Sequence, residues 1–273
     1  MAPSAFQSVV LRLLARQRRE RGESYVAGGV ALNALLVAPR RSRDIDLFHD
    51  TTEALNVTWA EDREALRRAG FDVKPIRESP GFVEAIVSGD AGRTAMQWVR
   101  DSAYRFFPLI EDDLLGLALH PFDLATNKVL TIAARVEARD WIDVLSCHVR
   151  LQPLGYLAWA ACGKDPGYNP VSLLSYCARR RFSYTEINDL EFDGHPPDAA
   201  ALGRTWHAAL HEAEAICAHL PPERLGTCVL AGNKELLRET PAQLPDALRA
   251  GRVQFHEGRI GGSWPTVVPL AGE

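Results

Sequence analysis

Two hydrophobic periods, one helical and one typical of strands, mark the N-terminal part of the chain. Residues 4–20 place apolar side chains at helical spacing and arginines on the other faces, which predicts an amphipathic helix that ends near Gly22. The stretch "YVAGGVALNALLV" (25–37) begins as a short buried strand. It breaks at Gly28 and Gly29 and continues as a helix that Pro39 must end.

The next apolar run, "RDIDLFH" (43–49), alternates with a period of two and is predicted to be a strand. Ile45 and Leu47 point to one face, whereas Asp44, Asp46 and Phe48 point to the other. Two carboxylates about 5–7 Å apart repel each other by roughly a few kcal/mol at an effective dielectric constant near 20. Without a partner of opposite charge, one of them would take up a proton.

The remaining pattern divides the chain into two parts. A charged helix is expected at about 60–69, followed by the strand-like runs "FDVKPI", "FVEAIVSG" and "RTAMQWVRD", the last two joined by the hairpin turn "GDAG". From residue 120 onward the period is helical and strand signals almost vanish. We therefore expect an α/β domain, of α+β type with a mixed sheet flanked by helices, over 1–112. A mostly helical domain with a Pro/Gly-rich tail is expected over 113–273.

Composition and charge narrow the class of protein. The chain has 273 residues and a formal charge of −4, so any contact with a polyanion must use a local basic patch. The five cysteines form no C-x-x-C pair, which argues against a disulfide scaffold and a cysteine-rich zinc site. The sequence shows no signal-peptide core and no window approaching ~18 uninterrupted apolar residues. We expect a cytoplasmic protein with no membrane contact.

The acidic strand and the glycine pair predict complementary chemistry. The carboxylates of Asp44 and Asp46 suit Mg²⁺ or Mn²⁺, and Mg²⁺ is usually held by one or two carboxylates together with substrate phosphates. Gly28 and Gly29 lie between a strand and a helix N-terminus, where free backbone N–H groups can hold phosphate. One short segment thus predicts both a metal clamp and a phosphate cradle.

These motifs resemble a known superfamily. "GG" followed after fourteen residues by "DIDLF", with "RRSR" immediately ahead, resembles the signature of DNA polymerase β-like minimal nucleotidyltransferases, and most closely their AbiEii/AbiGii toxin-type group. The second landmark of that group is a helix that bears Lys, then Arg, then R-D-x-x-D. Here "NKVLTIAARVEARDWIDVL" supplies Lys128, Arg135, Arg139, Asp140 and Asp143.

The resemblance implies roles for these residues. Asp44, Asp46, Lys128, Asp140 and Asp143 would be catalytic. The residues expected to bind nucleotide are Gly28, Gly29, Arg40, Ser42, Lys128, Arg135 and Arg139. On an unbroken helix, Lys128, Arg135, Arg139 and Asp143 would share one face, with Asp140 further round. The alternative interpretation of this helix is an Arg–Asp ladder on its surface.

A third acidic residue is expected beside the pair in many members of the superfamily. Asp101, at the end of "RTAMQWVRD", is the first candidate for this third metal ligand, and Glu84 is the second.

The implied function is transfer of NMP from an NTP to an acceptor hydroxyl. The metal would be Mg²⁺ or Mn²⁺, the acceptor an RNA such as a tRNA end, and an antitoxin protein a further partner. Two alternatives remain open: an antibiotic-type enzyme with a small-molecule acceptor, and a catalytically silent binding module of the same fold.

Overall fold

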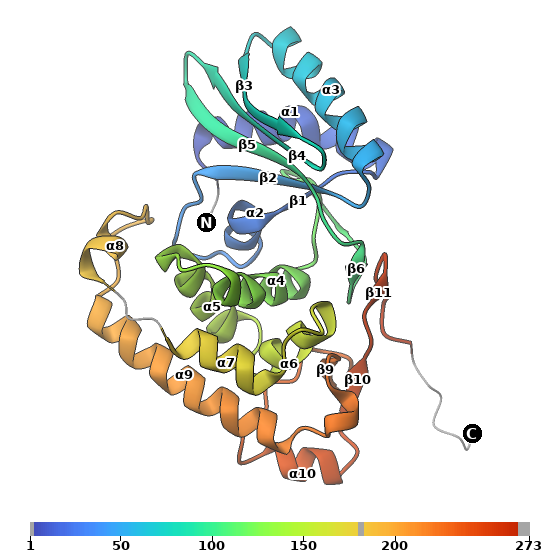
Figure 1. The fold of residues 1–273 in the computed structure, drawn as a ribbon, viewed down its shortest axis with the longest axis vertical. Coiled ribbons are helices and arrows are strands. Elements are labelled where there is room, and N and C mark those ends of the chain that lie inside the picture. The colour runs from blue at the N-terminus through green and yellow to red at the C-terminus, as the bar shows by residue number, and fades with distance from the viewer. Residues whose placement is uncertain (1–2, 180–182, 267–273) are drawn as a thin grey trace.

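The computed structural model describes residues 3–179 and 183–266, and it shows a sheet-containing half above a helical half (Figure 1). The last residues of the Pro/Gly-rich tail, 267–273, lie outside the described part. In that part, no helix combines the length and apolar character needed to cross a membrane.

A mixed sheet of seven strands organises the upper half, as the sequence predicts. The strand order is β3-β4-β5-β2-β1-β8-β7, in which β2 and β5 are parallel, as are β1 and β8. The strands are β1 (Tyr25–Ala27), β2 (Asp44–His49), β3 (Asp72–Ser79), β4 (Phe82–Gly89), β5 (Gly92–Arg100), β7 (Ile110–Asp112) and β8 (Gly116–Ala118). The acidic strand β2 is therefore central and has a neighbour on each side.

Three helices flank this sheet. Helices α1 (Ala5–Arg21) and α3 (Thr52–Arg68) cover one face, whereas the short α2 (Gly28–Leu35) lies on the other face, toward the helical half (Figure 1). Helix α1 ends at Gly22, which adopts the left-handed conformation, as expected. Helix α3 begins earlier than the predicted residue 60, because the Thr51 side chain caps it by accepting a hydrogen bond from the Ala54 N–H.

The lower half is mostly helical. Its helices are α4 (Pro121–Ala134), α5 (Ala138–Arg150), α6 (Leu154–Lys164), α7 (Pro170–Ala178), α8 (Tyr184–Asn188), α9 (Ala199–His219), a 3₁₀ turn η1 (Pro222–Arg224) and α10 (Leu244–Arg249). Short strands also occur there. β9 (Cys228–Ala231) pairs with β10 (Val253–His256), and β11 (Arg259–Ile260) returns to pair with β6 (Tyr104–Arg105) of the upper half.

The two halves are closely joined. The predicted division after residue 112 falls between β7 and β8, which pair with each other in the same sheet. One continuous hydrophobic core contains residues of both halves, from Leu11 and Trp98 to Trp141 and Trp206. The sheet therefore extends to Ala118, and α4 is the first helix that packs beneath it.

The single helix expected to carry Lys128, Arg135, Arg139, Asp140 and Asp143 is divided in two. Helix α4 ends at Ala134, Arg135 has extended backbone angles (φ −146°, ψ 167°), and α5 begins at Ala138. The break turns the Arg135 side chain back toward Asp140 on α5, where it forms hydrogen bonds of 2.8 and 3.2 Å. Tertiary contacts have overridden a segment whose local pattern is helical.

Candidate active site

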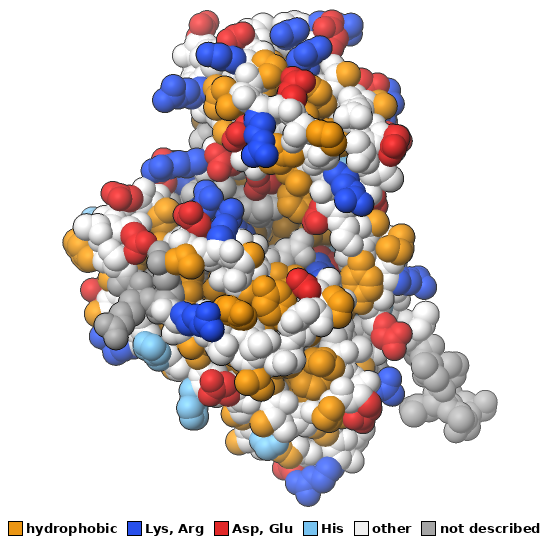
Figure 2. Space-filling model, viewed as in Figure 1, with side chains coloured by type: hydrophobic (Ala, Val, Ile, Leu, Met, Phe, Trp, Pro, Cys, Tyr) orange, Lys and Arg blue, Asp and Glu red, His pale blue; other side chains and the backbone are white. Residues whose placement is uncertain are grey.

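A cavity of about 310 Å³ opens between the sheet and α4, and it is lined by residues from both halves. Figure 2 shows the molecule hollowed at this level, with acidic and basic side chains around the opening. The cavity contains both carboxylates of β2, the glycine turn before α2 and a set of four cations. The cations are Arg40, Lys128, Arg135 and Arg139.

Period-two alternation places the acidic pair in this cavity. Ile45 and Leu47 are fully buried on the opposite face of β2, so Asp44 and Asp46 face the opening. Burial raises the pKa of Asp46 to about 6, although Lys128 opposes the shift. Asp44 lies 3.6 Å from the Arg139 guanidinium.

The glycine pair is required by close packing against these side chains. Gly28 has φ +63°, and a Cβ there would collide with the Asp46 carboxylate. A Cβ on Gly29 would lie 2.7 Å from an Arg40 nitrogen and 2.9 Å from the Ser42 hydroxyl. The turn therefore brings the N-terminus of α2 directly against the acidic strand and the basic loop. Its free N–H groups are available to an anion in the cavity.

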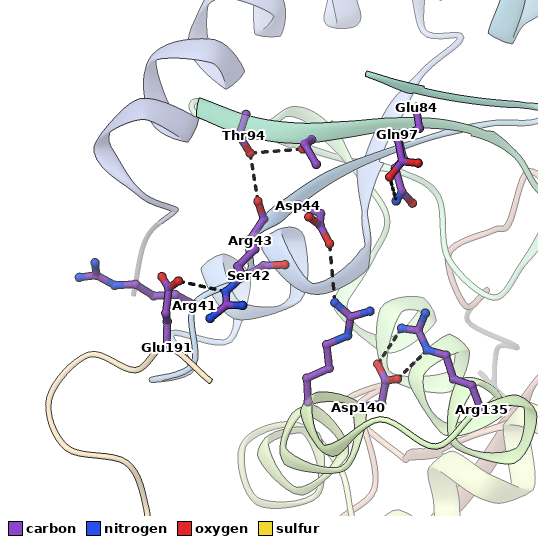
Figure 3. A network of polar contacts seen from close by, with 12 residues as sticks. Arg41, Ser42, Arg43, Asp44, Glu84, Thr94, Gln97, Arg135, Asp140 and Glu191 are labelled. Carbon is purple, nitrogen blue, oxygen red and sulfur yellow. Dashed lines mark hydrogen bonds and ion pairs between the residues drawn. The ribbon is translucent and has the colours of Figure 1, made fainter. Parts of the chain in front are cut away.

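A buried ion-pair network holds three of the four cations in place. Arg40 donates two hydrogen bonds to Asp143, at 2.7 and 2.8 Å, from a sequence distance of 103 residues. The Lys128 ammonium lies between two carboxylates, 2.8 Å from Asp140 and 3.1 Å from Asp143. Arg135 donates to both carboxylate oxygens of Asp140 (Figure 3). These contacts make the surface-ladder interpretation wrong for Lys128, Asp140 and Asp143, because their side chains are buried.

The network also shifts the pKa of Lys128 and of Asp140. Burial alone would lower the pKa of Lys128, but Asp143 and Asp140 raise it above its ordinary value, so the ammonium stays charged. Burial would raise the pKa of Asp140, yet the hydrogen bonds from Arg135 and Lys128 lower it. One donor is left over: among the described residues, the buried Nε of Arg139 has no hydrogen-bond partner.

Asp140 and Asp143 take a different place from the predicted one. Both are fully buried behind the cations and neither lines the cavity. Their carboxylates bind the side chains of Arg40, Lys128 and Arg135. The cations therefore do not lie along one helix. They line the cavity from four places, namely the loop before β2, α4, the residue at the end of α4, and α5.

The position beside Asp46 is occupied by a neutral side chain. In the parallel β2–β5 pair, Asp46 is opposite Gln97, which lines the same cavity. Gln97 donates a 3.1 Å hydrogen bond to Glu84 on β4, so Glu84 lies one strand further from the acidic pair (Figure 3). Asp101 follows four residues after Gln97, about 13 Å along the strand at 3.3 Å per residue. That distance is too long for Asp101 to share an ion with Asp46, so we do not retain it as a metal ligand.

Asp44 and Asp46 still fit a divalent cation. In residues 3–179 and 183–266, no cluster of three or more His, Cys, Asp or Glu side chains forms a metal site. The donors are two hard carboxylates on one face, and Asp46 accepts no hydrogen bond from the described residues. A Mg²⁺ ion held by two carboxylates and substrate phosphates matches this set.

A segment that the sequence pattern did not connect to the site braces its basic loop. Backbone hydrogen bonds of 2.8 Å join Arg41 to Glu191 and Asp193 to Pro39. An ion pair joins Arg41 to Asp193. A second joins Arg43 to Glu191 (Figure 3). No motif predicts this contact, because the two segments are about 150 residues apart.

Comparison with solved structures shows that this fold is a nucleotidyltransferase fold. The chain is similar to the nucleotidyltransferase toxin MenT4 from Mycobacterium tuberculosis H37Rv, with a TM-score of 0.51 and 18% identity, over 80% of this chain and 85% of that one. JHP933 from Helicobacter pylori is similar with a TM-score of 0.44 and 14% identity, over 75% and 89% of the two chains. Comparison with protein-family models and with curated proteins finds no match. The likeness to MenT4 confirms the predicted fold.

Proposed function

We propose that the protein is a metal-dependent nucleotidyltransferase that transfers NMP from an NTP to an acceptor hydroxyl. The observation that carries the proposal is one cavity in which Asp44 and Asp46 face four cations beside a glycine turn. Carboxylates alone would suit any metal site and cations alone any anion site. A cavity of about 310 Å³ with carboxylates on one side and cations on the other suits a metal-bound polyphosphate.

The proposed mechanism assigns a task to each wall. Asp44 and Asp46 would hold Mg²⁺ or Mn²⁺, which neutralises charge on the reacting phosphate when bound. The N–H groups of the Gly28 turn and the unpartnered Nε of Arg139 would donate to the remaining phosphate oxygens. Lys128 and Arg135 would stabilise the pyrophosphate as its charge develops.

In the reaction, the acceptor hydroxyl loses its proton to solvent and its oxygen bonds to the α-phosphorus. The bond from that phosphorus to the pyrophosphate oxygen breaks, and pyrophosphate leaves. Transfers of this kind depend mainly on positioning and charge neutralisation. Asp140 and Asp143 contribute by holding Arg40, Lys128 and Arg135 in fixed orientations before substrate binds.

RNA is the acceptor class that we propose first, together with a toxin-like role and an antitoxin partner. Its support is the resemblance of the two sequence motifs to the AbiEii/AbiGii group, and the likeness of the fold to a protein described as a nucleotidyltransferase toxin. One observation favours a small-molecule acceptor as the second candidate. Arg41 and Arg43, next to the cavity, are already paired with acidic side chains, which weakens the local attraction for a polyanion.

The test is incubation of the purified protein with Mg²⁺, total RNA and each labelled NTP in turn, with EDTA and Asp46→Asn as controls. Metal-dependent label on RNA that is lost in Asp46→Asn would support the first proposal. Label on a set of small hydroxylated compounds, and none on RNA, would select the second. Absence of transfer with every NTP and both acceptor classes would contradict the proposed activity.

A further inference from the structure

A second cavity, of about 330 Å³, adjoins the first. The two share four lining residues, namely Phe48, Val99, Asn127 and Thr131. The second cavity lies toward the C-terminal ends of β2 and β5, whereas Arg40 and Ser42 line the first cavity at the N-terminal end of β2. A ligand whose phosphates lie among the four cations can therefore extend past Phe48 into this second space.

The charges of the second cavity do not suit phosphate. Its one cation, Lys164, is already satisfied, because its ammonium lies 2.8 Å from an Asp123 oxygen and 2.8 Å from the Asn127 side-chain oxygen. Two carboxylates, Asp101 and Asp165, also line it. In the described part of the chain the Asp101 carboxylate makes no hydrogen bond or ion pair, and it is only half-buried. Such a wall attracts hydroxyl and amino donors and repels anions.

Asn127 adds a donor with a fixed direction. A lysine ammonium can only donate, so the Asn127 oxygen must face Lys164 and its NH₂ group is turned away from it. This residue lines both cavities. The rings of Phe48 and Tyr104 supply aromatic surface next to it. An acceptor, a donor and ring faces in one cavity are the features that recognise an uncharged heterocycle on a sugar.

We propose that the second cavity binds a nucleoside, with Asp101 accepting a hydrogen bond from a ribose hydroxyl or an exocyclic amine. This proposal rests on the proposed nucleotidyl transfer and specifies the part of a substrate that Asp101 contacts. Two substrates carry such a group: the incoming NTP and the terminal nucleotide of an RNA acceptor. Asp101 thereby acts in substrate binding and has no part in holding the metal.

The test compares Asp101→Asn with wild type in calorimetric titrations, with Mg²⁺ present, of each NTP and of inorganic tripolyphosphate, followed by measurement of the KM for RNA. Asp90→Asn is the matched control, because Asp90 is an exposed aspartate at the hairpin turn beyond the opposite end of β5. Ser102→Trp is a second variant that narrows the cavity at an exposed position without removing a buried group.

If the cavity holds the nucleoside of the NTP, Asp101→Asn and Ser102→Trp weaken NTP binding about tenfold and leave tripolyphosphate binding unchanged. If it holds the acceptor's nucleoside, NTP binding is unchanged and the KM for RNA rises by a similar factor. The proposal would be overturned if NTP affinity and the KM for RNA were both unchanged in both variants. It would also be overturned if the variants lost affinity for NTP and for tripolyphosphate equally. Wild-type protein that binds neither NTP nor tripolyphosphate would instead overturn the proposed function, and this proposal with it.

Discussion

The two faces of the central sheet use the same strands for opposite purposes. Toward α1 and α3, strands β2 and β5 present Leu47, Met96 and Trp98, all fully buried. Toward α4, the residues between them, such as Asp46 and Gln97, line an open cavity. Neighbouring residues of the same strand thus face opposite ways, one into the hydrophobic core and the next into a polar cavity.

A carboxylate with a similarly shifted pKa nevertheless lies on each side of the sheet, Asp46 on β2 and Asp62 on α3. Burial raises the pKa of both Asp46 and Asp62 to about 6. Asp62 accepts a 2.9 Å hydrogen bond from the Trp98 indole within the core, whereas Asp46 opens onto the cavity and its cations. A perturbed pKa therefore identifies a functional residue only when the group is also open to a ligand.

The largest difference between the two faces is expected in the transfer activity that is lost when each of these carboxylates is replaced. Asp46→Asn should lower transfer activity on the order of a thousandfold, because a metal ligand contributes several kcal/mol to the transition state. Asp62→Asn should leave activity within a few-fold and change mainly the free energy of unfolding. Rates under saturating NTP, with circular dichroism to verify folding, measure both effects. Equal activity losses in the two variants would contradict the assignment of Asp46 to the metal.

The next largest difference is expected between two buried cations, Lys128 on the cavity side of the sheet and Arg18 on the core side. Lys128→Met leaves Asp140 and Asp143 with less compensation, so it should lower the free energy of unfolding by about 3–5 kcal/mol and weaken NTP binding. Arg18→Met, on the core face, removes hydrogen bonds to Ser24 and the Leu115 carbonyl and should cost about 1–3 kcal/mol with no effect on NTP affinity. Urea denaturation and calorimetry separate the outcomes. Unchanged NTP affinity in Lys128→Met would limit this lysine to a structural role.

The pH dependence of Mg²⁺ affinity and of stability should also differ between the two faces. Mg²⁺ binding requires ionised Asp46, so Mg²⁺ affinity should rise about tenfold between pH 5 and pH 7 as this carboxylate loses its proton near pH 6. Without metal the sign reverses. The folded chain keeps a proton on Asp46 that the unfolded chain releases near pH 3.8, so stability from this group falls as pH rises from about 4 to 6.

Asp46→Asn should remove both slopes, whereas Asp62→Asn should remove only its own part of the stability slope. Thermal melts from pH 4 to pH 7, with and without Mg²⁺, provide the measurement. A Mg²⁺ affinity that does not change with pH would show that Asp46 is not the titrating ligand.

The smallest expected effect concerns two glutamine–glutamate pairs. Gln97→Glu replaces the hydrogen bond to Glu84 by repulsion and should cost about 1 kcal/mol without metal, which added Mg²⁺ should recover, because the new carboxylate lies opposite Asp46. Gln17→Glu breaks the equivalent hydrogen bond to Glu61 between α1 and α3. It should lower stability by no more than Gln97→Glu does, and added Mg²⁺ should not restore that stability. Melts at increasing Mg²⁺ concentration test this. An equal response in both variants would place Gln97 outside the metal's reach.

Local patterns predicted much of this site. Alternation in "RDIDLFH" placed Asp44 and Asp46 on one face, and the glycine pair gave the turn that packs against them. The helix break at Arg135 was missed, since residues 135–137 contain no glycine or proline. At the break Arg135 forms an ion pair with Asp140, a contact that becomes evident only in three dimensions.

The remaining features depend on register and long-range contact. Gln97 could not be identified as the neighbour of Asp46, because a strand pattern does not specify which residues pair across parallel strands. Asn127, which lines both cavities, lies one residue before Lys128 and carries no motif of its own. The positioning role of Asp143 was likewise hidden, since its partner Arg40 precedes it by 103 residues.

That separation has a consequence for the protein during its synthesis. Arg40 leaves the ribosome well before Asp143, the carboxylate that fixes its orientation. At about 5–20 residues per second, the 103 intervening residues take roughly 5–20 s to translate. For most of that interval the nascent chain carries Asp44, Asp46 and the glycine turn but, of the four cations in the cavity, only Arg40. The growing chain therefore cannot complete this cavity until α5 has emerged, and α5 ends at Arg150 in a chain of 273 residues.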